Sequence, residues 1–387
     1  MARRPRPRKS RGRSRVGERF TALVGPVAHG GHCVVRLPEP ETRVVFTRHA
    51  LPGETVVVEI TEGTEGDRFW RGDAVEVLAP APDRVEAPCP VAGPGGCGGC
   101  DFQHATLPAQ RALKTTVVRE QLVRLGGLDA TDPPVARLEV ERVPAGPGDA
   151  DDGLRWRTRV RFATTADGRR AMRKHHAHEV VPVDNCLIAH PDAVEPSPGE
   201  RIVELVDTSR GSRVYVVARD GFWQVHPGAP RVLVETVLDL LEPQAGERCL
   251  DLYAGVGLFA GFLADAVGAD LVVAVESDRA ACRQARANLG PGIRVVPGSV
   301  DRVLVAEPGL AADLIVLDPP REGARRPVVD QVVAREPRAV AYVACDPAAL
   351  ARDVAIFAEH GYRLTRLRAF DLFPMTHHVE CVALLTR

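Results

Sequence analysis

Hydrophobic positions recur with two different periodicities along the chain. Between residues 18 and 80, short runs of alternating apolar and polar residues are separated by Gly and Pro turns, as in "TRVVFTRHALPGETVVVEITE". Such closely spaced strands predict a small β-barrel over 16–80. From Pro230 onward, apolar strands alternate with amphipathic helices. This alternation predicts a doubly wound, mainly parallel, Rossmann-like α/β sheet over 226–387, whose ligands bind at the carboxyl ends of its strands.

The region between these two parts is less regular. The stretch "PAQRALKTTVVREQLVRLGGL" has apolar residues at helical spacing and stops at Gly126-Gly127. Segments 81–104 and 142–153 are rich in Pro and Gly and predict loops. From Leu154 to Gln224 the pattern is again typical of strands. We therefore predict a central β-rich module over 81–225.

Composition narrows the class of protein. The 387 residues include 45% hydrophobic residues and carry a net charge of -1, and no apolar run reaches the roughly 18 residues of a membrane span. The arginine-rich start is not followed by the apolar segment of a secretory signal, so we expect a cytoplasmic protein. Residues 1–15 are predicted to form a disordered basic arm, which either binds RNA phosphates or aids solubility. Nothing in the sequence indicates a protein partner, and we expect a monomer.

A glycine-rich turn follows the first strand of the α/β part. In "DLYAGVGLFA", Gly255 and Gly257 precede a helix, and Glu276 closes the next strand, where a carboxylate can accept hydrogen bonds from ribose hydroxyls. The spacing also fits a dinucleotide-binding turn, so a nicotinamide-dependent dehydrogenase is one interpretation. Asp251 on the strand and the "DPP" motif that begins at Asp318 favour an S-adenosylmethionine-dependent methyltransferase.

A cysteine stands between a strand and a helix in "AYVACDPAALARD". Asp346 suits the cap position of that helix and Pro347 its first turn, so Cys345 faces a helix N-terminus. The partial positive charge there predicts a lowered pKa and a nucleophilic thiolate, whereas a buried inert thiol is the alternative. Glu380 begins the apolar strand of "HHVECVALL", where an acid is costly unless it is paired or functional. A nucleophile, an acid and a cofactor pocket together indicate attack on an electron-poor ring.

Six ordered motifs between residues 222 and 385 resemble those of the RNA (uracil-5-)-methyltransferase family. They are "FWQVHPGA", "DLYAGVGLF", "VES", "LDPPREG", "VACDPAALARD" and "HHVECVALL". The resemblance implies that Cys345 adds to C6 of uracil, that C5 then accepts the methyl group of S-adenosylmethionine, and that Glu380 removes the C5 proton. It also implies a set of residues that bind the cofactor and the target base. These are Gln224, Tyr253, Gly255, Gly257, Glu276 and Asp318.

Two positions depart from the family pattern. Asp346 stands where the family commonly has Asn, and Ala254 stands where Cys is frequent. Asp346 can still cap the helix, but its negative charge opposes thiolate formation at Cys345.

Four of the nine cysteines suggest a second kind of site. Cys89, Cys97 and Cys100 lie close together in "CPVAGPGGCGGC", and Cys186 lies farther along the chain. In a cytosolic protein this pattern predicts metal binding, and spacing alone leaves zinc and iron–sulfur both open. The family resemblance implies a [4Fe–4S] cluster on these four thiols, with zinc as the alternative.

The barrel motifs "VAHGGHCVVR" and "FTRHALPGETVVVEI" resemble a TRAM domain, which implies an OB-like barrel and structured RNA as the partner. Ribosomal RNA, 23S in particular, is our first expectation and transfer RNA the second. A target uridine inside folded RNA has to be splayed out of its stack to reach the thiol. The alternative from another functional class is an RNA-binding protein of the same fold that lacks turnover.

Overall fold

The computed structural model describes residues 12–146, 149–175 and 177–387 and divides the chain into two compact units. The first comprises the residues up to Gln110 together with 163–186 and 375–377. The second comprises 111–162, 187–374 and 378–387. Most of the predicted basic arm, residues 1–11, lies outside the described residues.

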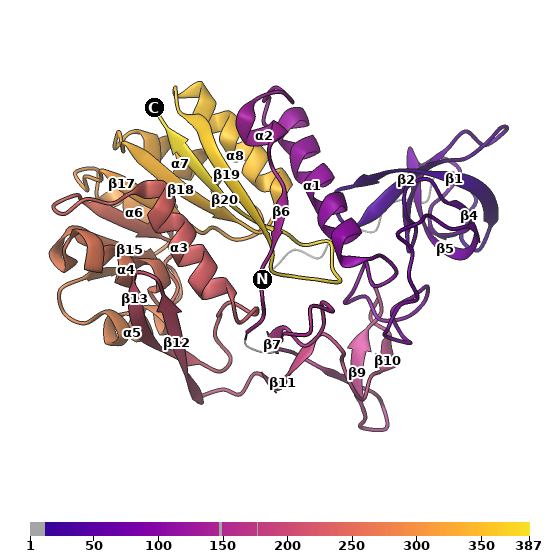
Figure 1. Ribbon diagram of the computed structural model, residues 1–387, viewed down its shortest axis with the longest axis horizontal. Coiled ribbons are helices and arrows are strands. Elements are labelled where there is room, and N and C mark those ends of the chain that lie inside the picture. Colours follow the sequence, from indigo (N-terminus) through magenta and orange to yellow (C-terminus); the bar gives the residue numbers. More distant parts are fainter. Residues whose placement is uncertain (1–11, 147–148, 176) are drawn as a thin grey trace. The chain divides into compact units, whose positions relative to one another are not determined.

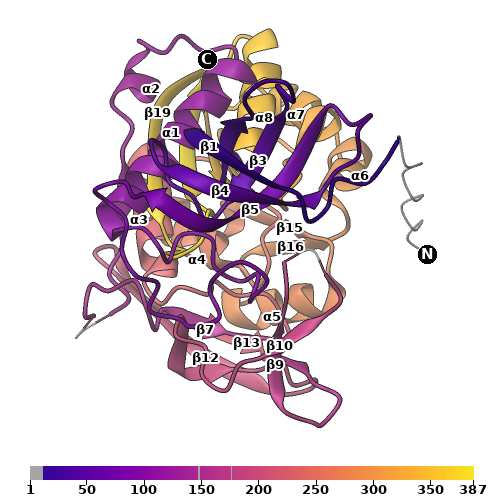
Figure 2. The same cartoon turned by 90° about the vertical axis from the view of Figure 1, so that its right-hand side faces the viewer.

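Five strands of the first unit close into a barrel, which confirms the predicted fold of this part (Figure 2). They are β1 (Arg19–Ala28), β2 (His32–Arg36), β3 (Val44–Arg48), β4 (Thr55–Glu62) and β5 (Phe69–Ala79), in the closed order β1-β2-β3-β5-β4. Alternate residues of β4, Val56, Val58 and Ile60, are completely buried, as the period of two in the sequence predicts.

Residues 12–15, the end of the predicted disordered arm, are ordered against the barrel. The Arg15 guanidinium lies 5.1 Å from the centre of the Trp70 ring and donates a hydrogen bond of 2.6 Å to Glu41. Ser14 pairs with Thr64 in an isolated β-bridge. These contacts assign residues 12–15 to the barrel rather than to the arm, because paired and stacked arginines lose the freedom that an arm of exposed charges retains.

The remainder of the first unit surrounds the cysteine-rich segment. A small sheet has the order β10-β9-β8 and consists of β8 (Ala163–Thr164), β9 (Arg170–Arg173) and β10 (Val180–Pro182). Three residues from near the C-terminus also belong here. Asp101 donates its backbone N–H to the Met375 carbonyl at 2.9 Å and accepts the backbone N–H of His377 at 3.1 Å. Gln110 accepts the backbone N–H of Met375 at 2.8 Å.

An eight-stranded sheet forms the centre of the second unit, in the order β16-β15-β14-β17-β18-β20-β19-β6. Its strands are β6 (Val140–Arg142), β14 (Cys249–Leu252), β15 (Val272–Glu276), β16 (Arg294–Pro297), β17 (Leu314–Leu317), β18 (Ala339–Ala344), β19 (Arg363–Asp371) and β20 (Glu380–Thr386). The five strands from β16 to β18 are parallel, and β20 is antiparallel to both of its neighbours. The predicted doubly wound, mainly parallel sheet is confirmed, while β19 and β6 were not predicted.

Helices cover both faces of this sheet (Figure 1). One face carries α3 (Ala229–Leu241), α4 (Leu258–Val267) and α5 (Arg279–Leu289), and the short 3-10 helix η1 (Ala269–Leu271) follows α4. The other carries α6 (Val300–Ala306), α7 (Arg325–Val333) and α8 (Pro347–Glu359), together with α2 (Pro133–Ala136) and part of α1 (Leu107–Arg124). Among the described helices, none is long and apolar enough to span a bilayer.

Two pairs of strands complete the second unit. β7 (Arg157–Arg159) pairs with β11 (Ala189–Val194), and β12 (Arg201–Thr208) forms a hairpin with β13 (Gly211–Ala218). Tyr215 and Val217 on one face of this hairpin are buried in the same core as α3 and α4. The hairpin therefore extends the hydrophobic core on that face of the sheet.

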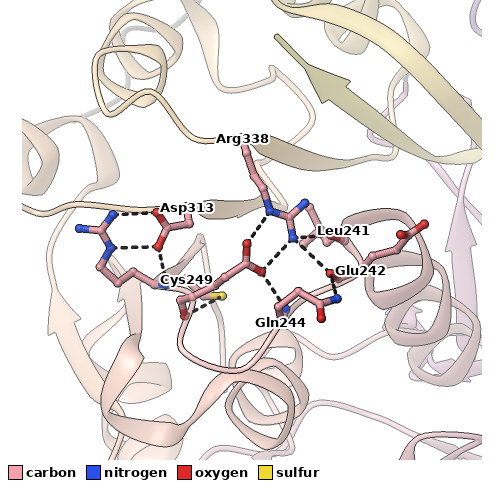
Figure 3. A network of polar contacts seen from close by, with 8 residues as sticks. Leu241, Glu242, Gln244, Cys249, Asp313 and Arg338 are labelled. Carbon is pink, nitrogen blue, oxygen red and sulfur yellow. Dashed lines mark hydrogen bonds and ion pairs between the residues drawn. The ribbon is translucent and has the colours of Figure 1, made fainter.

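Ion pairs join the amino ends of the central strands, and Figure 3 shows this network from close by. Arg338, directly before β18, donates to two carbonyl groups at the end of α3 at 3.1 Å each and to the Glu247 carboxylate at 2.8 Å. Asp313, before β17, pairs with Arg248, before β14, at 2.7 Å. These contacts hold together the edge opposite the one where ligands are expected.

Candidate active site

The glycine turn after β14 is held in place by a hydrogen bond to the end of β15, the neighbouring strand of the sheet. Tyr253, Gly255 and Gly257 have φ angles of 67°, 56° and 94°, values that favour glycine. A Cβ atom on Gly257 would lie 2.7 Å from Leu289, so close packing against α5 requires glycine there. Glu276, at the end of β15, accepts the backbone N–H of Gly255 at 2.9 Å. The predicted acid and the predicted turn are therefore brought together.

Asp251 is fully buried on β14 beneath this turn. Its Oδ2 accepts the N–H of Ala260 in the first turn of α4 at 2.8 Å, whereas its Oδ1 is buried without a hydrogen-bond partner among the described residues. Burial raises the pKa of Asp251 to about 7, and the nearby carboxylates of Asp318 and Glu276 add to the shift. An acid that is buried in this way is costly for stability, which marks the turn as a functional region.

The pairing of β18 with β20 sets Cys345 opposite Glu380. In this antiparallel pair Ala344 lies opposite Cys381, so the next position in the same register joins Cys345 to Glu380. Residues that face each other in an antiparallel pair have Cα atoms about 4.5–5.5 Å apart. Because side chains alternate between faces of a strand, Glu380 continues the face of Val382, which is the α3 and α4 face, and its charge acts on the thiol of Cys345, the residue directly after β18. Glu380 is 4% exposed, and Cys345 is half-buried.

Asp346 caps α8 as predicted. Its side chain accepts the backbone N–H of Ala349 at 2.8 Å, and the helix begins at Pro347. Cys345 therefore lies directly before the cap of α8, a helix of 13 residues, as its sequence context indicates.

The expected lowering of the thiol pKa is wrong for this structure. The pKa of Cys345 is raised to about 12, first by burial and then by the carboxylates of Glu380, Asp318 and Asp346, while the Arg321 guanidinium acts in the opposite direction. Burial and three nearby acids therefore outweigh the positive charge of Arg321. Arg321 was not among the predicted site residues, although its place directly after the "DPP" motif at a strand end could have indicated that its charge lies near the thiol.

Two acids share the electrostatic environment of the thiol. Burial raises the pKa of Asp318 at the end of β17 to about 7. Burial and the charge of Asp318 raise the pKa of Glu380 well above its ordinary value. Acids that are close together and poorly solvated do not all ionise at neutral pH. This cluster can therefore hold a proton and exchange it with a bound ring.

The other predicted binding residues differ in how closely they join this cluster. Tyr253 is half-buried in the glycine turn, and burial raises its pKa to about 12. Gln224 is half-buried between the buried residues Trp223 and His226, and His226 stacks on Trp156 with 6.1 Å between ring centres. In the part of the chain that the structure describes, no hydrogen bond joins the Gln224 side chain to the cluster.

The cysteine-rich segment of the first unit brings several thiols near one another. Burial raises the pKa of Cys100 to about 12, and the neighbouring Cys97 and Cys186 add to this shift. The Cys97 sulfur accepts the N–H of Gly99 at 3.4 Å. Within residues 12–146, 149–175 and 177–387, however, no three His, Cys, Asp or Glu side chains are arranged to hold a metal ion. The thiols as placed therefore do not form a complete ligand group.

The Rossmann-like sheet with its glycine turn and its acids at the carboxyl edge is the fold of S-adenosylmethionine-dependent methyltransferases. A family model for tRNA (uracil-5-)-methyltransferases matches residues 309–387, and a TRAM-domain model matches residues 13–75. An RNA methyltransferase of Streptomyces avermitilis is 46% identical and covers 96% of this chain and 98% of its own length.

Two further proteins are similar over most of the chain. A 23S rRNA (uracil(1939)-C(5))-methyltransferase of Shewanella sp. (strain ANA-3) is 29% identical and covers 91% of this chain and 93% of its own length. The crystal structure of Pyrococcus abyssi tRNA (uracil-54, C5)-methyltransferase in complex with S-adenosyl-L-homocysteine is 20% identical, with a TM-score of 0.66. It covers 95% of this chain and 100% of its own, and this likeness shows the fold.

The chain belongs to the RNA (uracil-5-)-methyltransferase family. It is an S-adenosylmethionine-dependent RNA uracil-C5 methyltransferase with a TRAM domain as its barrel. The dehydrogenase interpretation is wrong, because the glycine turn belongs to a methyltransferase domain.

Replacing Glu380 by Gln should stabilise the protein at neutral and higher pH. The pKa of Glu380 is raised in the folded state above its ordinary 4.5, so the unfolded chain ionises first and wild-type stability falls as pH rises from that value. Glutamine does not titrate. We expect Glu380→Gln to be more stable by about 1–3 kcal/mol at pH 8 and by less at pH 5, measured by urea unfolding.

Glu359→Gln is the matched control for this measurement. Glu359 is an exposed acid of α8 whose pKa is lowered, first by its hydrogen bond to Arg326. Its replacement should not stabilise the protein at either pH. A stabilisation by Glu380→Gln that does not grow with pH would contradict the assigned shift.

Alkylation of Cys345 by iodoacetamide should report its raised pKa. Far below the pKa the thiolate fraction rises about tenfold per pH unit, so the rate should climb from pH 7 to 10 without levelling. Asp346→Asn keeps a helix cap but removes a charge that raises the pKa of Cys345. We expect this variant to react roughly 2- to 10-fold faster at a given pH, followed by mass spectrometry of the Cys345 peptide.

Asp330→Asn removes one negative charge from α7 and should leave the alkylation profile unchanged. Slower alkylation in Asp346→Asn would mean that the cap matters more than the charge, and the assignment would then be wrong.

Proposed function

We propose that this enzyme methylates C5 of a uridine in structured RNA through a covalent bond between Cys345 Sγ and C6 of the base. The single observation that carries the proposal is the register of β18 and β20, which places Cys345 and Glu380 opposite each other at the carboxyl edge. A nucleophile and a proton acceptor that are neighbours at one edge of a sheet can act on adjacent atoms of one flat ring.

The proposed reaction balances at each step. The Cys345 thiol gives up its proton to solvent as Sγ bonds to C6, and the electron pair of the C5–C6 double bond moves onto C5 and the adjacent carbonyl, which makes C5 nucleophilic. S-adenosylmethionine, when bound, supplies the methyl group to C5. Glu380 then takes the proton from C5, the double bond re-forms, and Sγ leaves C6 as a thiolate. A carboxylate with a raised pKa is a stronger base once it is ionised.

Further residues are proposed to bind the cofactor and the base. Glu276 ends β15 beside the glycine turn, where a carboxylate suits ribose hydroxyls. No atom lies within 4 Å of the Cβ position of Gly255, which leaves room for a close ligand. We assign the following residues to binding of the cofactor and the target base: Gln224, Tyr253, Gly255, Gly257, Glu276 and Asp318.

We further propose ribosomal RNA, in the cytoplasm, as the substrate, with transfer RNA second. The Shewanella relative named for a 23S rRNA uracil supports ribosomal RNA, and the Pyrococcus abyssi structure named for a tRNA uracil supports the second choice. The TRAM barrel is proposed to hold the RNA while the target uridine leaves its stack. The part of the arginine arm within residues 1–11 is proposed to add phosphate contacts.

RNA that contains 5-fluorouracil tests the covalent step, because fluorine at C5 cannot leave as a proton. With S-adenosylmethionine present, we expect an RNA adduct that survives denaturing electrophoresis and disappears in Cys345→Ala. Glu380→Gln should keep this adduct but lose turnover on ordinary RNA by about 10²–10⁴-fold. Fragments of 23S ribosomal RNA and transfer RNA transcripts compared side by side would identify the substrate.

Cys282→Ala, which replaces a buried cysteine of α5, should form the adduct normally. If folded wild-type protein forms no adduct and transfers no methyl group to any of these RNAs, the chain is an RNA-binding protein without turnover, and the proposed reaction is wrong.

We also propose that a [4Fe–4S] cluster binds to Cys89, Cys97, Cys100 and Cys186. The mutual influence of Cys97, Cys100 and Cys186 and the N–H bond to the Cys97 sulfur support this proposal. The thiols as placed do not complete a ligand group, and no step of the reaction is assigned to the cluster.

Anaerobic purification tests the cluster. We expect about four iron and four sulfide ions per chain and a brown protein. Cys186→Ser should lose most of this iron, whereas Cys249→Ser, in the buried strand β14, should retain it. Zinc in place of iron would support the alternative. Protein that contains neither iron nor zinc would contradict a metal site here.

A further inference from the structure

A buried acid on α8 caps a different helix. Asp353 is 2% exposed and lies between Leu350 and Val354, which belong to the core. Its Oδ2 accepts the N–H of Ala324 at 2.7 Å, and its Oδ1 accepts the N–H of Arg325 at 3.1 Å. α7 begins at Arg325 and has no side-chain cap of its own. Asp353 therefore satisfies N–H groups that the start of α7 leaves open.

Tyr342 completes this arrangement from β18. Its hydroxyl group donates to Asp353 Oδ2 at 2.5 Å and accepts the N–H of Ala324 at 3.0 Å. The Tyr342 side chain is completely buried. A carboxylate in such a position is stable when several donors surround it, and the donors here come from β18 and from the start of α7.

The loop between β17 and α7 lies closely on this pair. Gly323 has a φ angle of 83°, and a Cβ atom there would come within 2.6 Å of Asp353 Oδ2 and 3.3 Å of the Tyr342 hydroxyl. The same loop begins with Asp318 at the end of β17 and contains Arg321. The N-terminal end of the loop is thus held by the sheet, and its C-terminal end is held by the hydrogen bonds to Tyr342 and Asp353.

Tyr342 and Asp353 also flank Cys345 in the chain. Tyr342 precedes the thiol on β18, and Asp353 follows it on α8. The two elements that position Cys345 therefore also hold the loop that carries Asp318 and Arg321, and these two groups act on the thiol electrostatically. The loop cannot shift without either breaking the bonds to Asp353 or moving α8.

We propose that Tyr342 and Asp353 are positioning residues that fix the loop from Asp318 to Ala324 relative to Cys345. This inference rests on the proposed function, in which Asp318 binds the cofactor or the target base and Cys345 attacks C6. A shift of about 1 Å in such a group can cost about 100-fold in rate. Neither residue touches the reacting atoms in this proposal.

A second buried tyrosine provides a matched control. Tyr362 is 1% exposed and lies on the same face of the sheet as Tyr342. Its hydroxyl group donates to the carbonyl of Pro337 at 2.7 Å, before the start of β18. Tyr362→Phe therefore removes an equivalent buried hydrogen bond at the other end of the same strand.

The test compares Tyr342→Phe, Asp353→Asn, their double variant and Tyr362→Phe in the full chain. In methylation assays, we expect the first two to lower kcat by about 10- to 100-fold with KM for RNA changed by less than about threefold. The double variant should lose little more than Asp353→Asn alone, because the two residues act as one unit. Tyr362→Phe should lower the thermal midpoint comparably and leave kcat unchanged.

A second readout does not depend on turnover. Release of the loop should move Asp318 and Arg321, whose charges act on the Cys345 pKa, so the rate of alkylation by iodoacetamide should differ from that of the wild type by about 3- to 10-fold in Tyr342→Phe and Asp353→Asn, and should stay unchanged in Tyr362→Phe. If wild-type protein transfers no methyl group, the proposed function fails, but this comparison still decides the positioning role. Equal alkylation rates in all folded variants, or equal kcat in Tyr342→Phe and Tyr362→Phe, would overturn it.

Discussion

The antiparallel pairing of β20 with β18 is the interaction on which the site depends. It joins a strand from the end of the chain to the strand that carries the thiol, and its register sets Glu380 opposite Cys345. A slip of one residue would turn every side chain of β20 to the other face of the sheet and bury Glu380 on the α7 and α8 side. The full burial of Cys381, Ala383 and Leu385 in that core holds the register in place.

The two edges of the sheet differ in how their charges are arranged. At the amino edge, arginines and acids are paired, as in the contacts of Arg338 and Asp313. At the carboxyl edge, Asp251, Asp318 and Glu380 have raised pKa values because burial is not fully compensated by hydrogen bonds. The paired charges at the amino edge are partly exposed and cost little, whereas the buried acids at the carboxyl edge lower the stability of the fold.

Local sequence patterns predicted those features that depend on neighbours in the chain. The barrel, the parallel sheet, the glycine turn and the cap at Asp346 follow from alternation, glycine spacing and helix-start preferences. The direction of the Cys345 pKa was predicted wrongly, because it depends first on burial and then on charges that come from the end of β17, the start of β20 and the loop after Asp318. The strand β19 escaped prediction since arginines interrupt its apolar pattern, and the network of Asp353 with Tyr342 is visible only after the chain has folded.

The path of the chain near its C-terminus limits how the enzyme can be divided. After Pro374 the chain contributes Met375–His377 to the first unit and returns to the second at His378, shortly before Glu380. A gene fragment that encodes residues 226–387 would lack Asp101 and Gln110, which bind this loop, and would also lack β6 at the edge of the sheet. Residues 226–387 therefore do not form an independent domain. Recombination between relatives should give a folded enzyme only when these residues are inherited together with the barrel and the cysteine-rich segment.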